Sequence, residues 1–139
     1  MRVEALALLL LAGSAAAHGL HDLRGEISLS EERLRIDLET TPSQRASGVC
    51  LRYLDELRVL GPGEDRFVGR LLPELEPGSC VLEYAFTKPV ESLELQLQPR
   101  RVQREHAERL VLAVKGRPEL LILTERGNRE RLSRPAFEP

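Results

Sequence analysis

Two segments of this chain alternate strictly between apolar and polar residues, and this pattern limits the folds open to it. In residues 33–39 every even-numbered residue is apolar and every odd-numbered one is charged. In residues 92–98 the odd-numbered residues are apolar instead. Because successive side chains of a β-strand point to opposite faces of a sheet, each segment predicts a strand with one face on a core and the other in water.

Weaker strand signals recur along the chain, separated by turn residues. The segment 23–29 continues the alternation and joins 33–39 through a polar turn, which predicts a hairpin. Further strands are predicted at 80–86, 110–114, 120–124 and 130–132, with glycine, proline or asparagine in the connections. The pattern therefore predicts a mainly β protein, an antiparallel, immunoglobulin-like β-sandwich of about six or seven strands.

One segment departs from the strand pattern. Thr41 precedes Pro42 and is followed three residues later by Gln44, an arrangement typical of a helix N-terminus. Leucines then recur at helical spacing, so we predict one short helix over 46–57 and a strand or loop after it. Residues 62–77 are rich in glycine and proline, which predicts an irregular excursion.

The first residues carry the pattern of a secretory signal peptide. A short charged start, an apolar run of about ten residues and the small-residue site Ala15-x-Ala17 follow one another. The run is shorter than the about 20 apolar residues that a membrane span needs. We expect residues 1–17 to be removed, a single domain over 18–133 and a flexible tail over 134–139. The mature chain would be exported, periplasmic or extracellular, with no transmembrane segment of its own.

The two cysteines, Cys50 and Cys80, support the same compartment. An even number of cysteines in an exported chain predicts a disulfide bond between them. Two buried free thiols are the alternative. A metal dithiolate is a weaker one, because the chain has no C-x-x-C motif.

Charge and composition argue against several classes of function. The net charge is −2, the charges are dispersed, and the chain has no Trp, so nothing favours a nucleic-acid partner. No serine lies in a G-x-S-x-G elbow, and no Walker, H-E-x-x-H or G-x-G-x-x-G motif occurs. We therefore do not expect an enzyme.

The three histidines, His18, His21 and His106, are the candidate metal ligands. An N-terminal His18 would chelate through its amine and imidazole, and His21 or His106 would add a further nitrogen. Nitrogen donors in a planar arrangement suit copper or nickel as the bound metal. Asp22 or Glu26 could contribute an oxygen. A cut after Ala15 would instead create Ala16-Ala17-His18, which is another square-planar site, and a terminus that binds no metal is the alternative to both.

The second half of the chain also carries a family resemblance. Its residues are Glu83-Tyr84-Ala85-Phe86, Leu93-Glu94-Leu95, His106, Leu110-Val111-Leu112 and Ile122-Leu123-Thr124. With the Ala17-His18 start, this pattern resembles the extracytoplasmic domain that precedes the membrane helices in HupE/UreJ-type proteins, a family linked with nickel or related metal transport. The membrane helices of that family have no counterpart here. The resemblance implies a β-sandwich at an envelope surface, acting beside a separate membrane transporter.

Two functions therefore remain open at this point. The first is an exported protein that binds copper or nickel at its N-terminal histidine and acts with a membrane metal transporter. The second is an envelope interaction module without metal, which docks through an exposed strand edge or through residues 62–77.

The cleavage site can be tested by intact-mass spectrometry of the exported protein. We expect the mass of a chain that begins at His18, because Ala15 and Ala17 occupy the −3 and −1 positions of the site. A chain that begins at Ala16 would favour the tripeptide metal site instead, and an uncleaved chain would contradict both.

Overall fold

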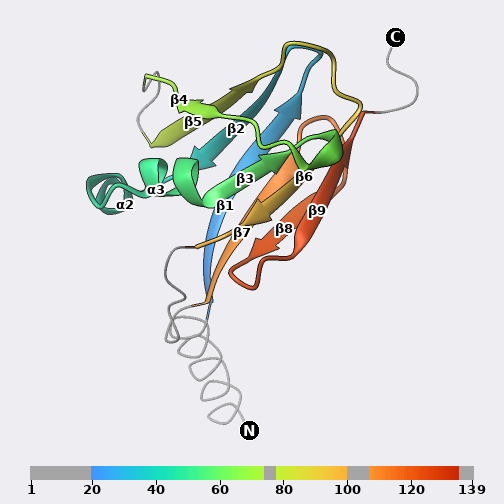
Figure 1. Ribbon diagram of the computed structural model, residues 1–139. Coiled ribbons are helices and arrows are strands. Elements are labelled where there is room, and N and C mark those ends of the chain that lie inside the picture. The colour runs from blue at the N-terminus through green and yellow to red at the C-terminus, as the bar shows by residue number, and fades with distance from the viewer. Residues whose placement is uncertain (1–19, 74–77, 100–106, 135–139) are drawn as a thin grey trace, which may run out of the picture.

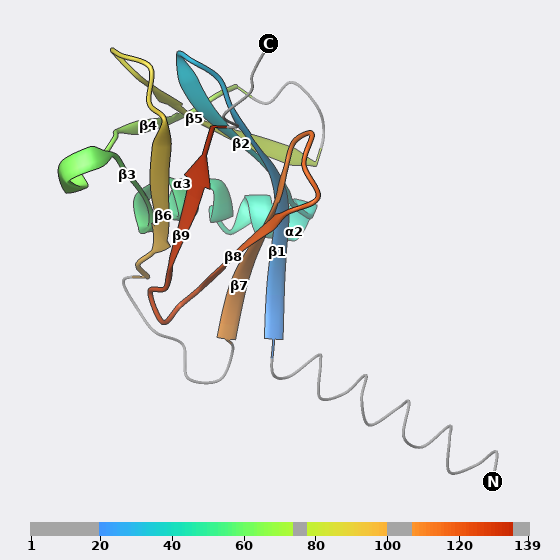
Figure 2. The ribbon, with the colours of Figure 1, turned by 90° about the vertical axis from the view of Figure 1, so that its right-hand side faces the viewer.

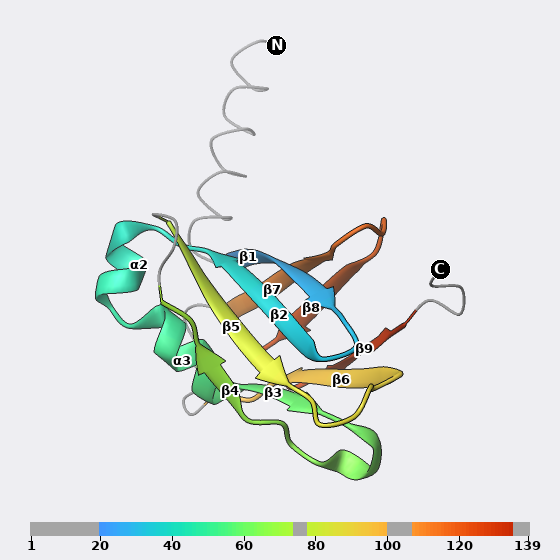
Figure 3. The same cartoon turned by 90° about the horizontal axis from the view of Figure 1, so that it is seen from above.

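The structure is a computed structural model that describes residues 20–73, 78–99 and 107–134, and these form two β-sheets packed face to face (Figure 1). The strands are β1 (Leu20–Leu29), β2 (Arg33–Glu39), β3 (Leu57–Leu60), β4 (Gly69–Leu71), β5 (Ser79–Ala85), β6 (Ser92–Leu97), β7 (Ala107–Val114), β8 (Leu120–Thr124) and β9 (Arg129–Ser133). The larger sheet has the order β4-β5-β2-β1-β7-β8, and the smaller one the order β3-β6-β9. Seen from above, β1, β2 and β5 lie in one layer and β3 and β6 in the other (Figure 3).

The predicted mainly β sandwich is confirmed, with two corrections. The sheets are not wholly antiparallel, because β1 and β7 pair in parallel over eight residue pairs. The described part of the chain also holds nine strands, more than the six or seven expected. The additional strands, β3 and β4, are only 4 and 3 residues long. Strands this short leave almost no alternation in a sequence to recognise.

Two short helices are present where one was predicted over 46–57. Helix α2 covers Pro42–Ala46 and α3 covers Val49–Glu56. Gly48, between them, has a φ of 80°, a left-handed conformation that interrupts the helical path and that glycine adopts at little cost. The capping box is confirmed: the Thr41 side chain accepts from the Gln44 amide, and the Thr41 amide donates to Gln44 Oε1 at 2.8 Å.

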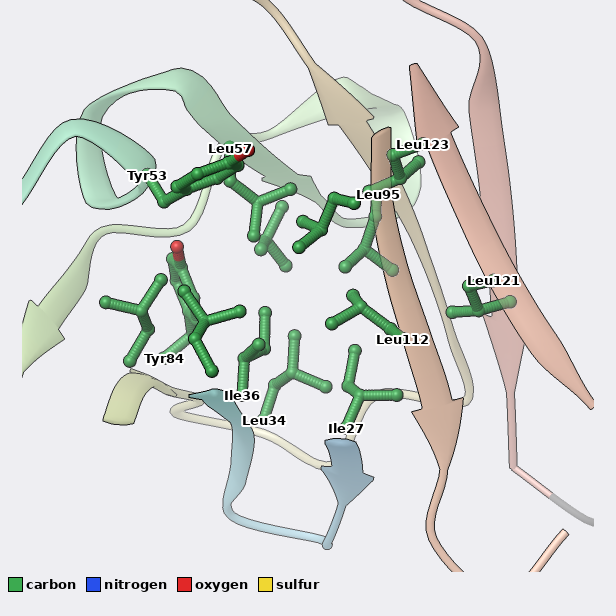
Figure 4. Packing of buried hydrophobic residues seen from close by; sticks show 14 of the residues in the cluster. Ile27, Leu34, Ile36, Tyr53, Leu57, Tyr84, Leu95, Leu112, Leu121 and Leu123 are labelled. Atoms are coloured by element: carbon green, nitrogen blue, oxygen red, sulfur yellow. The ribbon is translucent and has the colours of Figure 1, made fainter. Parts of the chain in front are cut away.

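The core lies between the sheets and is closed at one side by α3. Apolar side chains from β1 and β2, such as Ile27 and Ile36, face Leu57 of β3 and Leu95 of β6 across it (Figure 4). Tyr53 of α3 is also buried among them. Full burial of each such large side chain contributes about 1.5–3 kcal/mol.

The first residue of β4, Gly69, lies directly against the side chain of its partner on β5. Gly69 pairs with Tyr84, and a Cβ atom at this position would overlap the tyrosine ring. The ring of Tyr84 is buried, and burial raises the pKa of its phenol to about 12. The segment 62–77, predicted to be irregular, thus contains one short strand, Gly69–Leu71, in its described part.

A disulfide bond joins Cys50 of α3 to Cys80 of β5, with the two Cα atoms 6.1 Å apart. This bond confirms the predicted cysteine pair and links helix α3 covalently to the larger sheet. None of the helices in the described ranges is long and apolar enough to cross a membrane.

Arg134, the last residue that the structure describes, is hydrogen-bonded to the sandwich. Arg134, which the sequence assigned to the tail, donates through its backbone amide to the Glu91 carbonyl at 2.7 Å. Its guanidinium donates to the carbonyls of Val90 and Ser30, at 2.6 and 2.5 Å. The β-sandwich therefore includes Arg134.

Reduction of the disulfide should destabilise the sandwich. The bond closes a loop with a sequence separation of 30 residues. In the chain-entropy account, such a closure lowers the free energy of the folded state relative to the unfolded state by about 3–4 kcal/mol. Urea unfolding of the oxidised protein and of the Cys50→Ala/Cys80→Ala variant should differ by this amount. Equal midpoints and slopes would contradict it.

Candidate functional site

Strands β1 and β7, next to which the predicted histidine ligands lie in the sequence, pair in parallel and begin together. Figure 2 shows the two strands side by side, both starting at the same end of the molecule. The first two residue pairs are Leu20 with Ala107 and His21 with Glu108. Parallel pairing therefore brings the start of the domain next to a segment more than 80 positions further along the chain.

The three histidines fall close to this end in the sequence. His21 belongs to the second pair, His18 precedes Leu20 by two residues, and His106 directly precedes Ala107. His18 and His106 lie outside the described residues. Each peptide link spans about 3.8 Å between Cα atoms, so both are attached within two links of the first pair. The structure thus brings together the strands to which all three candidate ligands are connected.

The predicted oxygen ligands have a different place in the structure. Both carboxylate oxygens of Asp22 accept hydrogen bonds from Arg109, from Nε and from Nη2, each at 2.9 Å. This hydrogen bonding raises the pKa of the Arg109 guanidinium above its usual value. The pair crosses from β1 to β7 at the third residue pair of the ladder. Asp22 is therefore bound to a cation of the protein and serves to hold the strands together.

Glu26 lies too far along the same strand to join the histidines. It is five residues after His21 within continuous β1. At about 3.3 Å per residue this is roughly 17 Å. Among the residues that the structure describes, no three His, Cys, Asp or Glu side chains are grouped as a metal site. A metal site at this end would therefore depend on His18 and His106.

The outer face of the larger sheet holds a buried carboxylate that the sequence does not predict. Glu83 of β5 is directly opposite Arg35 of β2 and Arg70 of β4. Its side chain is only 3% exposed. Arg70 donates to one of its oxygens at 2.7 Å, while Arg33 and Arg35 lie 3.3 and 3.7 Å from the other. The sequence shows only an alternating strand here, so nothing in it marks Glu83 as the centre of this cluster.

The arginines determine the ionisation of Glu83. The hydrogen bond from Arg70 is the main cause that lowers the pKa of this carboxyl, and the charge of Arg33 adds to it, against the opposing effect of burial. Arginine side chains, rather than the core, cover the carboxylate, so the group remains charged close to the surface. The cluster stabilises the pairing of β4, β5 and β2.

The chain was also compared with protein families and with curated proteins. A scan against models of protein families finds no match, and a search of curated proteins finds no relative of significant similarity.

The arginine cluster predicts a stability that depends on pH. The lowered pKa means that Glu83 stabilises the fold above its ordinary pKa of 4.5, and that this contribution is lost as the pH falls toward the lower, folded-state value. At pH 7, Glu83→Gln should lower the free energy of unfolding by about 1–2 kcal/mol, since the partner arginines are half-exposed. The difference from wild type in urea unfolding should shrink below about pH 4.

Glu31→Gln is the matched control, because this glutamate lies exposed in the β1–β2 turn. It should change the free energy by less than about 0.5 kcal/mol. A Glu83→Gln effect that is equally small at pH 7, or one that persists unchanged at pH 3, would contradict the role given to the cluster.

Proposed function

We propose that this protein is an exported β-sandwich that binds copper or nickel at its N-terminal end. His18 would supply its amine and imidazole, and His21 or His106 a further nitrogen. The observation that supports this best is the parallel β1–β7 pair, because all three histidines of the chain fall within two residues of its first pair. A site built from all three imidazoles would therefore need only short stretches of chain beyond this strand end.

Copper is the metal that this donor set should prefer. A terminal amine and neutral imidazoles are nitrogen ligands, which suit Cu(II) and Ni(II) in planar geometry, and Cu(II) stands highest in the divalent series. The ion pair of Asp22 with Arg109 would hold the two strands in register directly beside the site. It would also leave the nitrogen donors without competition from that carboxylate.

The partner in this proposal is a membrane metal transporter of the HupE/UreJ type, or another envelope protein. The support is the resemblance of the strand pattern together with the secretory pattern of the first 17 residues. The Cys50–Cys80 disulfide fits an oxidising compartment. The protein would collect or buffer the metal outside the cytoplasm and pass it to the transporter.

A Cu(II) titration by calorimetry on protein that begins at His18 tests this proposal. We expect tighter binding of Cu(II) than of Ni(II) or Zn(II), and affinity that falls as the pH drops through about 6.5, because the imidazoles must be neutral. One extra residue before His18 should weaken binding at least about tenfold, since it moves the amine out of the chelate ring. His21→Ala and His106→Ala show which imidazole completes the set.

Glu26→Gln is the control, because Glu26 lies on the same strand but well away from its start. It should bind Cu(II) as the wild type does. Equal affinity of the extended and unextended proteins, or affinity no better than that of a free His-Gly-Leu-His peptide, would reject the metal site.

A non-metal interaction module is the second candidate, and strand β8 is the observation that favours it. Leu120 and Ile122 on the outer face of this edge strand are 56% and 37% exposed. Asn128 occupies part of the edge: its side chain accepts from the Thr124 amide and donates to the Ile122 carbonyl, both at 2.8 Å. An envelope protein with an extended apolar segment could add to the remaining edge at Leu120. Rejection of the metal site would make this the better proposal.

A further inference from the structure

A cleft beside β3 brings two arginine side chains together. It is lined by Asp55, Arg58, Arg66, Gln98 and Pro99. Arg58 belongs to β3, between the buried residues Leu57 and Val59, so its side chain points to the outer face of the smaller sheet. Arg66 comes from the segment that returns along β3, where it forms a bridge with Leu60. Cationic groups from two separate segments thus reach one cleft.

Both guanidinium groups are held by neutral oxygens. Arg58 Nη1 donates to Gln98 Oε1 at 2.9 Å, and Arg66 Nη2 donates to the backbone carbonyl of Asp55, also at 2.9 Å. That carbonyl lies in the last turn of α3, where carbonyl groups lack partners within the helix. These contacts fix the position of each guanidinium without pairing it with a carboxylate of the described residues.

The arginines of this cleft differ from those of the Glu83 cluster. Within the described ranges, neither Arg58 nor Arg66 lies within ion-pair distance of a carboxylate. Arg58 Nε is buried and has no hydrogen-bond partner among those residues. Glu64 interacts electrostatically with Arg58, but its carboxylate accepts a hydrogen bond from Arg129 at 2.6 Å. A guanidinium of this kind is best satisfied by an oxyanion.

We propose that this cleft binds a small oxyanion, a phosphate or a carboxylate group, between Arg58 and Arg66. A planar guanidinium presents parallel N–H donors that match two oxygens of such a group. Asp55 on the cleft wall opposes the anion, so affinity should be modest and should depend on this residue. The proposal is independent of the metal site, because the cleft is formed by β3, the end of α3 and the end of β6.

Titration of the ¹⁵N-labelled protein with sodium phosphate and with sodium acetate, followed by NMR at pH 7 and low constant ionic strength, tests the proposal. We expect saturable shifts of the Arg58 and Arg66 side-chain N–H signals. Arg58→Gln should weaken binding about tenfold, since it removes a charge-assisted hydrogen bond. Asp55→Asn should tighten it by about threefold, because a like charge is removed from the wall.

Arg24→Gln is the matched control, since Arg24 is an exposed arginine on β1 of the other sheet. Its variant should bind as the wild type does. Binding of phosphate alone would identify a phosphate group as the ligand, and binding of acetate a carboxylate. If Arg58→Gln fails to fold, the exposed Asp55→Asn variant still decides the question. Absence of saturable shifts with both anions up to about 50 mM, which corresponds to only about 2 kcal/mol, would overturn the proposal. So would anion affinity that is the same in Asp55→Asn and wild type.

Discussion

The parallel pairing of β1 with β7 is the contact on which the larger sheet depends. On one side of it lie β2, β5 and β4, and on the other side lies β8. Eight residue pairs connect the first strand of the domain with a strand from its last third. Leu23, Ile27, Leu110 and Leu112 are buried along this seam. Without it, the β7–β8 hairpin would have no sheet to join, and the core would lose one wall.

The same pairing gives the molecule an end at which distant segments meet. The ion pair of Asp22 with Arg109 closes the seam near the start of both strands. Bidentate arginine–carboxylate contacts fix geometry as well as adding energy. The proposed metal site would therefore lie beside a fixed strand pair, even though His106 is more than 80 positions from His18 and His21 in the sequence.

The arginines of the two clusters described above have different kinds of partner. On the larger sheet, Arg33, Arg35 and Arg70 surround Glu83 and satisfy a buried carboxylate. Beside the smaller sheet, the side-chain hydrogen bonds of Arg58 and Arg66 to the described residues go to neutral oxygens. The residue type is the same, and the sequence gives no sign of the difference. What distinguishes them is whether the register places a carboxylate opposite, as the pairing of Glu83 with Arg35 does.

Local rules of chain geometry were enough to predict much of the fold from the sequence. The alternation in 33–39 and 92–98 places their leucines and isoleucine in the core, and the capping box recognised at Thr41 does begin a helix. The Cys50–Cys80 pair was predicted as well. These features depend on neighbouring residues or on a pair with no competitor. The left-handed conformation of Gly48 could not be predicted from these local rules, since glycine is also tolerated within helices.

The tertiary structure alone decided which strands are partners and in which direction they run. Alternation specifies the buried face of a strand, but it is the same for parallel and antiparallel neighbours. The partner of β1 and the burial of Glu83 follow from contacts between segments far apart in the chain, and the cleft of Arg58 and Arg66 needs the return of the chain along β3. The sequence by itself determined that this chain forms a β-sandwich with a capped helix and a disulfide. Its candidate sites were decided only when the strands paired, because each site is assembled from residues of separate segments.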